Sequence, residues 1–290
     1  MRQRTESRWV RLRKDAIDKA EELACRTSND LPTNLGKIAT RQGVHAIQFR
    51  PLLSDGGIAV SEDGFLIYVK ADSDQGEDLT AQFAEDGVGA GLPRQMIRRA
   101  RFTIAHEIAH TFFYDTHLTP PKPKIELKNA TSVRSLERVC NSVAGTLLLP
   151  EAFLEREFSD ADLSQPSELS RLADVALISN HALVRRLQEL RRFPHPIAIV
   201  ACIEWNEGQW VIKSVSRHYS LRGLFKDAEE GAALTELVDH PDFLPNGGAF
   251  PEVDVELGER ADALRMRFFC DPAFRQNTRR SFYVTGIRLN

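Results

Sequence analysis

The chain lacks the features that mark secreted, membrane-spanning and broadly nucleic-acid-binding proteins. No apolar run approaches the roughly 20 residues that a membrane helix needs, and residues 1–20 carry charge without the apolar centre of a secretory signal. The net charge of −3 excludes a protein whose whole surface is basic and binds nucleic acid. The cysteines are few and form no Cys-x-x-Cys pair: Cys25, Cys140, Cys202 and Cys270. We therefore expect a reduced, cytoplasmic protein with no membrane partner.

The residues that are present suffice for a folded core. Hydrophobic residues make up 42% and charged residues 27% of 290, as in a globular chain with one large or two medium domains. Apolar periodicity predicts helices over residues 11–26, 93–114, 132–149, 167–175 and 179–191. Strand-forming runs predict strands over residues 45–49, 57–60, 65–69, 197–205, 210–216 and 281–289. The sequence therefore predicts an α+β fold.

A change in predicted secondary structure along the chain marks the expected domain boundaries. The proline-containing stretch 193–196 separates a helix-rich part from a strand-rich part. We expect a first domain at residues 1–160, a helix-turn-helix-like helical segment at 161–193 and a smaller β-rich C-terminal domain at 197–290. The acidic, glycine-containing stretch 72–91 is expected to be a loop.

The segment 101–110 reads R-F-T-I-A-H-E-I-A-H and holds a His-Glu-x-x-His motif inside a helical apolar pattern. Residues four apart share one helix face, so the imidazoles of His106 and His110 can reach one cation. Glu107 projects beside them and can accept a proton from a water molecule. Imidazole suits Zn²⁺, and a catalytic zinc site needs three protein ligands and one open position. Mn²⁺ or Fe²⁺ can also fill such a site.

A third ligand must come from another segment. The best candidate is Glu137, an acidic residue in an otherwise apolar predicted helix, because burying a carboxylate is costly unless it is paired or bound to a metal. The alternative is that Glu137 is a solvated surface charge. The other candidates for the third position are Asp115, His117 and Glu126.

Several motifs, taken in order, closely resemble the ImmA/IrrE family of metallo-endopeptidases. The His-Glu-x-x-His segment is followed by Glu137-x-x-x-Asn141 and then by L-L-L-P at residues 147–150. A later stretch, I-S-N-H-A-L-V-R-R-L at residues 178–187, is similar to another helix of that family. The resemblance covers about residues 35 to 192.

The resemblance implies a zincin-like peptidase domain in which His106, His110 and Glu137 are ligands and Glu107 is the general base. It also implies that the C-terminal domain is a sensor-like addition. The chain departs from the family in two places, because Tyr114 stands where histidine is common and Cys140 where alanine is usual. Tyr114 then supplies a phenol hydroxyl in place of an imidazole.

We also expect roles for residues outside the proposed metal-ligand set. Asn141 lies one turn after Glu137 and is expected to orient a ligand or to bind substrate backbone, unless it only packs. Cys140 is expected to be a small buried core residue, with a redox-sensing thiol as the less favoured reading. Residues 65–69 are the candidate edge strand for pairing with an extended substrate, against the alternative of an ordinary core strand.

Residues 167–191 resemble a helix-turn-helix, and Arg185 and Arg186 are its candidate contacts to DNA or protein. A helical pair that packs on the peptidase is favoured, because the chain is acidic overall. The expected function is a zinc endopeptidase. The family resemblance implies a helix-turn-helix transcriptional repressor as its substrate, with stress-response or mobile-element genes induced by cleavage. The alternative is a DNA-binding regulator with a structural or vestigial zinc site.

Overall fold

The computed structural model describes residues 8–71, 80, 83, 87–89, 94–124, 133–158, 166–190, 197–206, 209–217, 253–257, 264–270 and 281–288. The predicted loop 72–91 lies almost wholly outside these residues. The chain divides into two compact units. One comprises Met1–Ser159 and Ala173–Ile178, and the other comprises Asp160–Leu172 and Ser179–Asn290.

The first unit contains a mixed sheet of three strands in the order β1-β3-β2. Its strands are β1 (Val44–Arg50), β2 (Gly56–Ser61) and β3 (Gly64–Lys70). The central strand β3 runs parallel to β1 and antiparallel to β2. Alternate side chains of β3, those of Phe65, Ile67 and Val69, are buried, as the two-residue period of a strand with one covered face requires.

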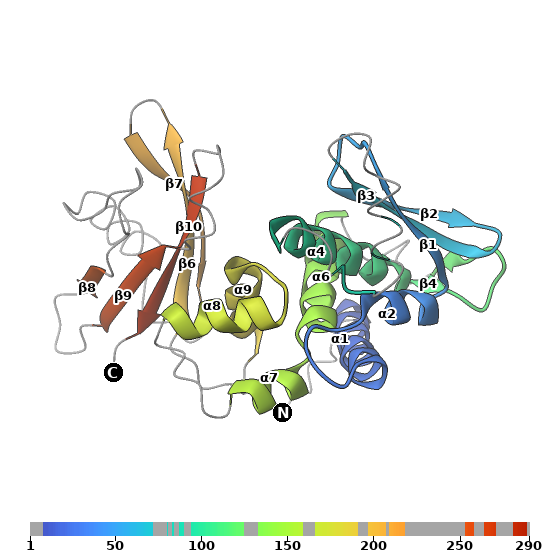
Figure 1. Cartoon of the computed structure of the whole chain (residues 1–290), viewed down its shortest axis with the longest axis horizontal. Coiled ribbons are helices and arrows are strands. Elements are labelled where there is room, and N and C mark those ends of the chain that lie inside the picture. Colours follow the sequence, from blue (N-terminus) through green and yellow to red (C-terminus); the bar gives the residue numbers. More distant parts are fainter. Residues whose placement is uncertain are drawn as a thin grey trace. The chain divides into compact units, whose positions relative to one another are not determined.

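Two long helices form the other layer of this unit. Helix α4 (Arg94–Thr111) packs beside α6 (Val133–Leu148), and α4 also contacts β2 and β3 (Figure 1). Helix α1 (Arg8–Thr27) packs on α6 through Ala16, Ala20 and Ala24, which repeat every four residues and are almost fully buried. Small side chains on that face let the two backbones approach closely.

Short elements complete the first unit. They are α2 (Leu35–Arg41), α7 (Glu151–Phe158) and a two-stranded ladder of β4 (Tyr114–Asp115) with β5 (Lys122–Pro123). Asn34 begins α2 by accepting a hydrogen bond from the Lys37 amide at 2.9 Å. Sequence periodicity did not predict α2 or α7, because each spans only about two turns.

The second unit contains an antiparallel sheet in the order β7-β6-β10-β9-β8. The strands are β6 (Ile197–Asn206), β7 (Gln209–Arg217), β8 (Val253–Leu257), β9 (Leu264–Cys270) and β10 (Ser281–Arg288). Helix α9 (Asn180–Glu189) belongs to this unit and packs on β6. Ser179 caps α9 by accepting a hydrogen bond from the Ala182 amide at 3.1 Å. Helix α8 (Pro166–Val175) spans the division between the units.

The described elements confirm the expected α+β class. The three-part domain division stays a prediction, as does the assignment of the first part as zincin-like. The expectation that residues 65–69 form a sheet edge is wrong, because β3 is hydrogen-bonded on both sides and β1 and β2 are the outer strands. The central strand was misassigned because pairing between distant segments leaves no local sequence signal.

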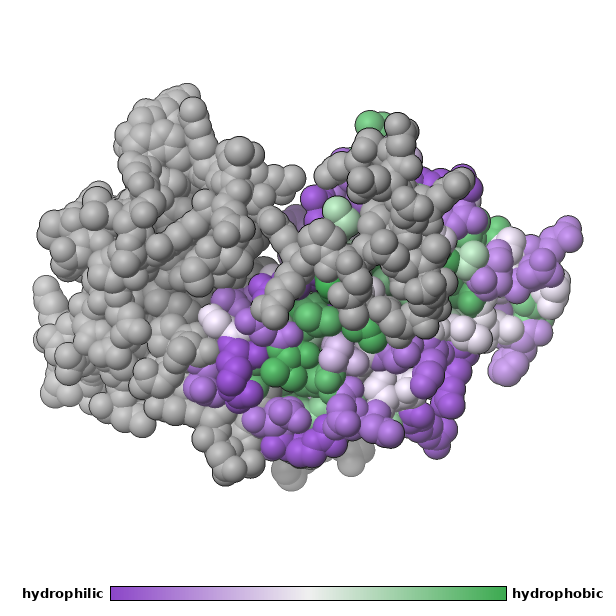
Figure 2. All heavy atoms as spheres, viewed as in Figure 1, coloured by the Kyte–Doolittle hydropathy of each residue, from purple (hydrophilic) through white to green (hydrophobic). Residues whose placement is uncertain are grey.

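The described helices include none with the length and hydrophobicity required to cross a membrane. The coloured part of the face in Figure 2 is mostly hydrophilic, with smaller hydrophobic patches. Large hydrophobic side chains that stay exposed in the described segments include Leu53 and Val133.

Candidate metal centre

Helix α4 presents the His-Glu-x-x-His motif at the boundary between the helical layer and the sheet. Its other faces are apolar, and Ile104, Ala105, Ile108 and Ala109 are fully buried. A helix buried on most sides is held in one rotational setting. That setting leaves the side chains of His106 and His110 only 17% and 18% exposed and turned toward α6.

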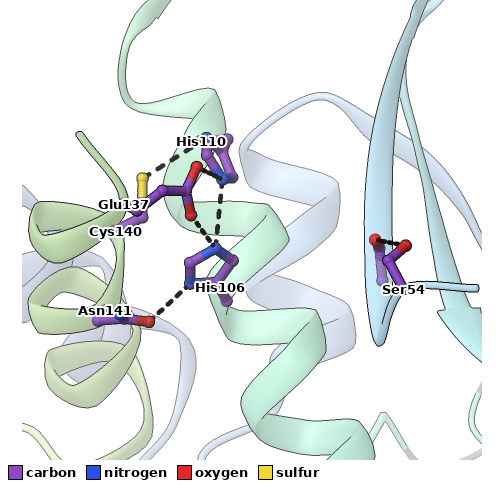
Figure 3. A network of polar contacts seen from close by, with 7 residues as sticks. Ser54, His106, His110, Glu137, Cys140 and Asn141 are labelled. Carbon is purple, nitrogen blue, oxygen red and sulfur yellow. Dashed lines mark hydrogen bonds and ion pairs between the residues drawn. The ribbon is translucent and has the colours of Figure 1, made fainter. Parts of the chain in front are cut away.

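Three potential ligands converge between α4 and α6. One ligand atom from each of His106, His110 and Glu137 lies within 4.8 Å of the others. The two Nε2 atoms are 3.3 Å apart. The carboxylate of Glu137 lies 3.0 Å from Nε2 of His106 and 3.6 Å from Nε2 of His110. Figure 3 shows the two imidazoles on α4 facing the carboxylate on α6.

Each imidazole also has a partner at its other nitrogen. Nδ1 of His106 lies 2.9 Å from Oδ1 of Asn141, and Nδ1 of His110 lies 3.5 Å from the sulfur of Cys140 (Figure 3). An amide oxygen is only an acceptor, so the neutral His106 tautomer that fits this contact carries its proton on Nδ1. Nε2 is then free of hydrogen and able to bind a cation. This contact supports the prediction that Asn141 orients a ligand, and the role itself stays a prediction.

Burial and charge shift the proton affinities around this cluster. Burial raises the pKa of Glu107 to about 7, and the nearby carboxylate of Glu137 adds to the effect. Burial and the neighbouring His106 lower the pKa of His110, although Glu137 opposes them. Burial, assisted by Glu137 and Glu107, raises the pKa of the Cys140 thiol well above its ordinary range. These shifts favour the neutral forms of the His110 imidazole and the Cys140 thiol.

The fully buried thiol bears on the redox-sensing reading of Cys140. Oxidants react with the thiolate and need access to it. Cys140 is 0% exposed and its pKa is raised, so neither condition is met. These properties favour the core-residue reading.

Glu107 lies beside the first residue of β2. The residue is 7% exposed. A Cβ placed on Gly56 would lie 3.1 Å from a carboxylate oxygen of Glu107 and 2.4 Å from the side-chain methyl of Thr103. Only glycine lets the strand approach the helix this closely. The general-base candidate is thus held between α4 and an outer strand of the sheet.

The donor set fits a divalent transition metal. Two imidazole nitrogens and one carboxylate are the ligands that zinc commonly takes in hydrolytic sites. Both Nδ1 atoms already have partners, so the lone pairs at Nε2 are directed at the space that the carboxylate shares. Three protein donors are also the number found in catalytic zinc sites, where water takes the fourth position.

Other predicted residues lie elsewhere. Tyr114 packs edge-on against Phe65 with ring centroids 5.2 Å apart. Within the described segments, Asp115 and His117 do not join the three-residue cluster. The remaining candidate for the third ligand, Glu126, lies outside the described residues.

The two arginines of α9 differ in exposure. Arg186 is 5% exposed, whereas Arg185 is exposed. Burial of Arg186 does not favour a role for it in contacting DNA or protein, and a contact through Arg185 stays a prediction.

Two residues of this region were not singled out by the sequence. One is Gly56, whose approach to Glu107 depends on strand placement. The other is Arg101, which is fully buried and donates a hydrogen bond from Nη2 to the carbonyl oxygen of Thr33 at 2.9 Å. A charged residue within a buried helical pattern was the available signal for Arg101. Its guanidinium ties α4 to the segment that precedes α2.

Comparison with known proteins supports the same region. Residues 93–188 match the IrrE N-terminal-like domain of peptidase family M78, and this range contains all of α4 and α6. No curated protein sequence matches the chain. Among solved structures, a Mycobacterium tuberculosis transcriptional regulator has a TM-score of 0.52 at 13% identity, over 96% of this chain and 80% of that one. Identity that low concerns the fold alone. The expected resemblance to the ImmA/IrrE metallopeptidase family is therefore confirmed over residues 93–188, which match the model of the IrrE N-terminal-like domain.

Proposed function

We propose that the chain is a zinc-dependent endopeptidase in which His106, His110 and Glu137 hold the metal. The observation that carries the proposal is the convergence of these three ligands within 4.8 Å. Glu107 directly follows His106 in sequence and is buried against β2. A structural metal site has no need of such a carboxylate.

Zn²⁺ at these donors would supply Lewis acidity that polarises the scissile carbonyl and makes water more acidic. Mn²⁺ or Fe²⁺ could take its place. The protein supplies the proton transfers. Glu107 takes a proton from the attacking water and returns it to the nitrogen of the leaving amine. Its high proton affinity in the metal-free site suits a group that must hold this proton between the two steps.

Substrate binding is assigned to β2. An extended peptide can add to a sheet edge through backbone hydrogen bonds alone. Strand β2 is an outer strand of the first sheet, and its first residue approaches Glu107. A segment paired with β2 would therefore pass the carboxylate that moves the proton.

The substrate proposed is a helix-turn-helix transcriptional repressor, as the family resemblance implies. Cleavage would induce the stress-response or mobile-element genes that the repressor controls. A repressor encoded next to this protein is the first one to test.

The test compares the purified chain with its Glu107→Gln variant. Both are loaded with zinc and incubated with the repressor encoded beside this protein. We expect Glu107→Gln to lower the cleavage rate by about 10²- to 10⁴-fold, because a positioned general base contributes that much. Metal content, measured by plasma mass spectrometry, is expected to stay at one ion per chain, and new termini are mapped by peptide mass spectrometry.

Glu155→Gln on α7 is the matched control, because it makes the same change at an exposed position. Equal cleavage by the wild type and Glu107→Gln would refute the role of Glu107. Absence of metal from the wild type would refute the metal site itself.

A DNA-binding regulator is the second candidate. The structural neighbour is described as a transcriptional regulator, and α8 and α9 form a helical pair. This reading predicts binding of operator DNA by the chain and no effect of Glu107→Gln in cells. A gel-shift titration with the Arg185→Glu variant as control separates the two candidates.

A further inference from the structure

The first unit contains a second concave site, which shares no residue with the metal-ligand cluster. It is a cavity of about 450 Å³, within the range typical of small-molecule sites. Its walls come from α1, the end of α2, the end of α4 and the β4–β5 ladder. The lining residues are Lys19, Glu22, Leu23, Arg26, Arg41, Gln42, Thr111, Phe112, Tyr114, Thr116 and Lys124.

The charges on this lining are strongly unequal. Among the described lining residues there are four cations, those of Lys19, Arg26, Arg41 and Lys124, and one carboxylate, that of Glu22. Glu22 is already 2.7 Å from Arg26 in an ion pair. Cations gathered in a concave surface repel one another and focus a positive potential there. The chain as a whole is acidic, with a net charge of −3, so this excess is local.

The C-terminal ends of α1, α2 and α4 lie at the cavity, and such helix ends carry negative potential that would oppose an anion. Their terminal carbonyls are, however, occupied by the protein's own donors. Lys124 donates from Nζ to the carbonyl oxygen of Phe112 at 2.6 Å, and the hydroxyl of Thr111 reaches the carbonyl oxygen of Ile108 at 2.6 Å. At the end of α2 the Gln42 amide donates to the carbonyl oxygen of Ala39 at 3.0 Å. Lys124 and Arg26 are engaged with protein groups, so the positive charge that can act on a ligand comes chiefly from Lys19 and Arg41.

The rest of the lining suits a ligand with an organic part. Leu23 and Phe112 add apolar surface, and Tyr114 and Thr116 add hydroxyl groups. Hydroxyls and cations together are the usual donors to phosphate oxygens. We propose that this cavity binds a phosphorylated small molecule, with the cations on the phosphate and the apolar side chains on the organic part.

Three residues that line the cavity follow the proposed ligand His110 closely in the sequence. Thr111 and Phe112 follow His110 directly, and Tyr114 begins β4 three residues after the end of α4. A ligand seated there would contact the segment that leaves α4. The proposal concerns binding only, and it stands or falls independently of peptidase activity.

Isothermal titration calorimetry of the zinc-loaded full chain tests the proposal. The probes are inorganic phosphate, adenosine monophosphate and uncharged adenosine. We expect adenosine monophosphate to bind with a Kd tighter than about 1 mM, phosphate more weakly and adenosine undetectably. The Lys19→Glu and Arg41→Glu variants are each expected to weaken binding by about tenfold or more, because each replaces attraction of the phosphate with repulsion.

Matched controls lie on the same two helices. Lys14→Glu on α1 and Lys37→Glu on α2 reverse exposed charges that do not line the cavity, and we expect them to leave the Kd within about twofold. Failure of both phosphate probes to bind the wild type would overturn the proposal. So would equal losses of affinity in the cavity variants and in the controls, or equally tight binding of adenosine.

Discussion

At the scale of single residues, the candidate site is built from pairs in which one side chain fixes another. Asn141 holds the proton of His106 on Nδ1, and Cys140 lies against Nδ1 of His110. The two contacts differ in strength, because an amide oxygen accepts a hydrogen bond well and a thiol sulfur accepts one weakly. We therefore expect His106 to be the more firmly oriented of the two imidazoles.

Glu107 carries a prediction about pH in the metal-free protein. Its pKa is about 7 in the folded state, above the ordinary value of 4.5, so folding binds a proton that the unfolded chain has released between these values. The free energy of unfolding must then decrease as pH rises from about 4.5 to 7 and level off above that range. A shift of this size corresponds to at most about 3 kcal/mol.

Urea unfolding in the presence of a chelator measures this effect. The wild type is compared with Glu107→Gln, which cannot titrate at that position. His110, whose lowered pKa has the opposite effect on stability, is present in both proteins, so its contribution cancels in the comparison. We expect the wild type to lose stability relative to the variant across the interval. Parallel curves would mean that Glu107 is not desolvated in solution. Bound zinc should flatten the difference, since a cation favours the carboxylate.

At the scale of elements, the start of β2 is placed by the absence of a side chain. Gly56→Ala would set a methyl group 2.4 Å from the methyl of Thr103 and 3.1 Å from an oxygen of Glu107. We expect β2 to move away from α4, at a cost of about 1–3 kcal/mol in the free energy of unfolding. Peptidase activity should decrease further than stability alone explains, because Glu107 is displaced as well.

The adjacent glycine provides the control. A Cβ on Gly57 would meet nothing within 4 Å, so Gly57→Ala should leave both activity and urea unfolding close to wild type. Thr103→Ser removes the nearest methyl group and should restore part of the activity to Gly56→Ala. Equal behaviour of the two alanine variants would show that the close approach of β2 to α4 is unimportant.

Most elements around the site could be predicted from the sequence because their signals are local. The ends of α4 and α6 were predicted to within about three residues, since periodicity, Pro93 and Pro150 all mark them. The one-turn spacing from Glu137 to Asn141 predicted that an amide could reach a ligand. The central place of β3 and the contact of Gly56 with Glu107 could not be predicted, because both depend on segments that meet only after folding.

At the scale of the whole molecule, the candidate metal would join helices α4 and α6. Its ligands His106 and Glu137 are 31 residues apart in the sequence. A ligand that binds the folded chain alone stabilises it by mass action, by about 2.7 kcal/mol at a free concentration 100 times its Kd. Zinc should therefore raise the melting temperature, and a chelator should reverse the change. Hydrogen exchange should slow in α4 and α6.

A pair of histidine variants decides whether this stabilisation comes from the proposed ligands. His110→Ala removes one of the three donors, so zinc should no longer raise its melting temperature at the same concentration. His45→Ala removes an exposed imidazole on β1 that does not belong to the cluster, and it should respond to zinc as the wild type does. If His110→Ala were stabilised as much as His45→Ala, the metal would be bound elsewhere. The endopeptidase proposal would then lose the site on which it depends.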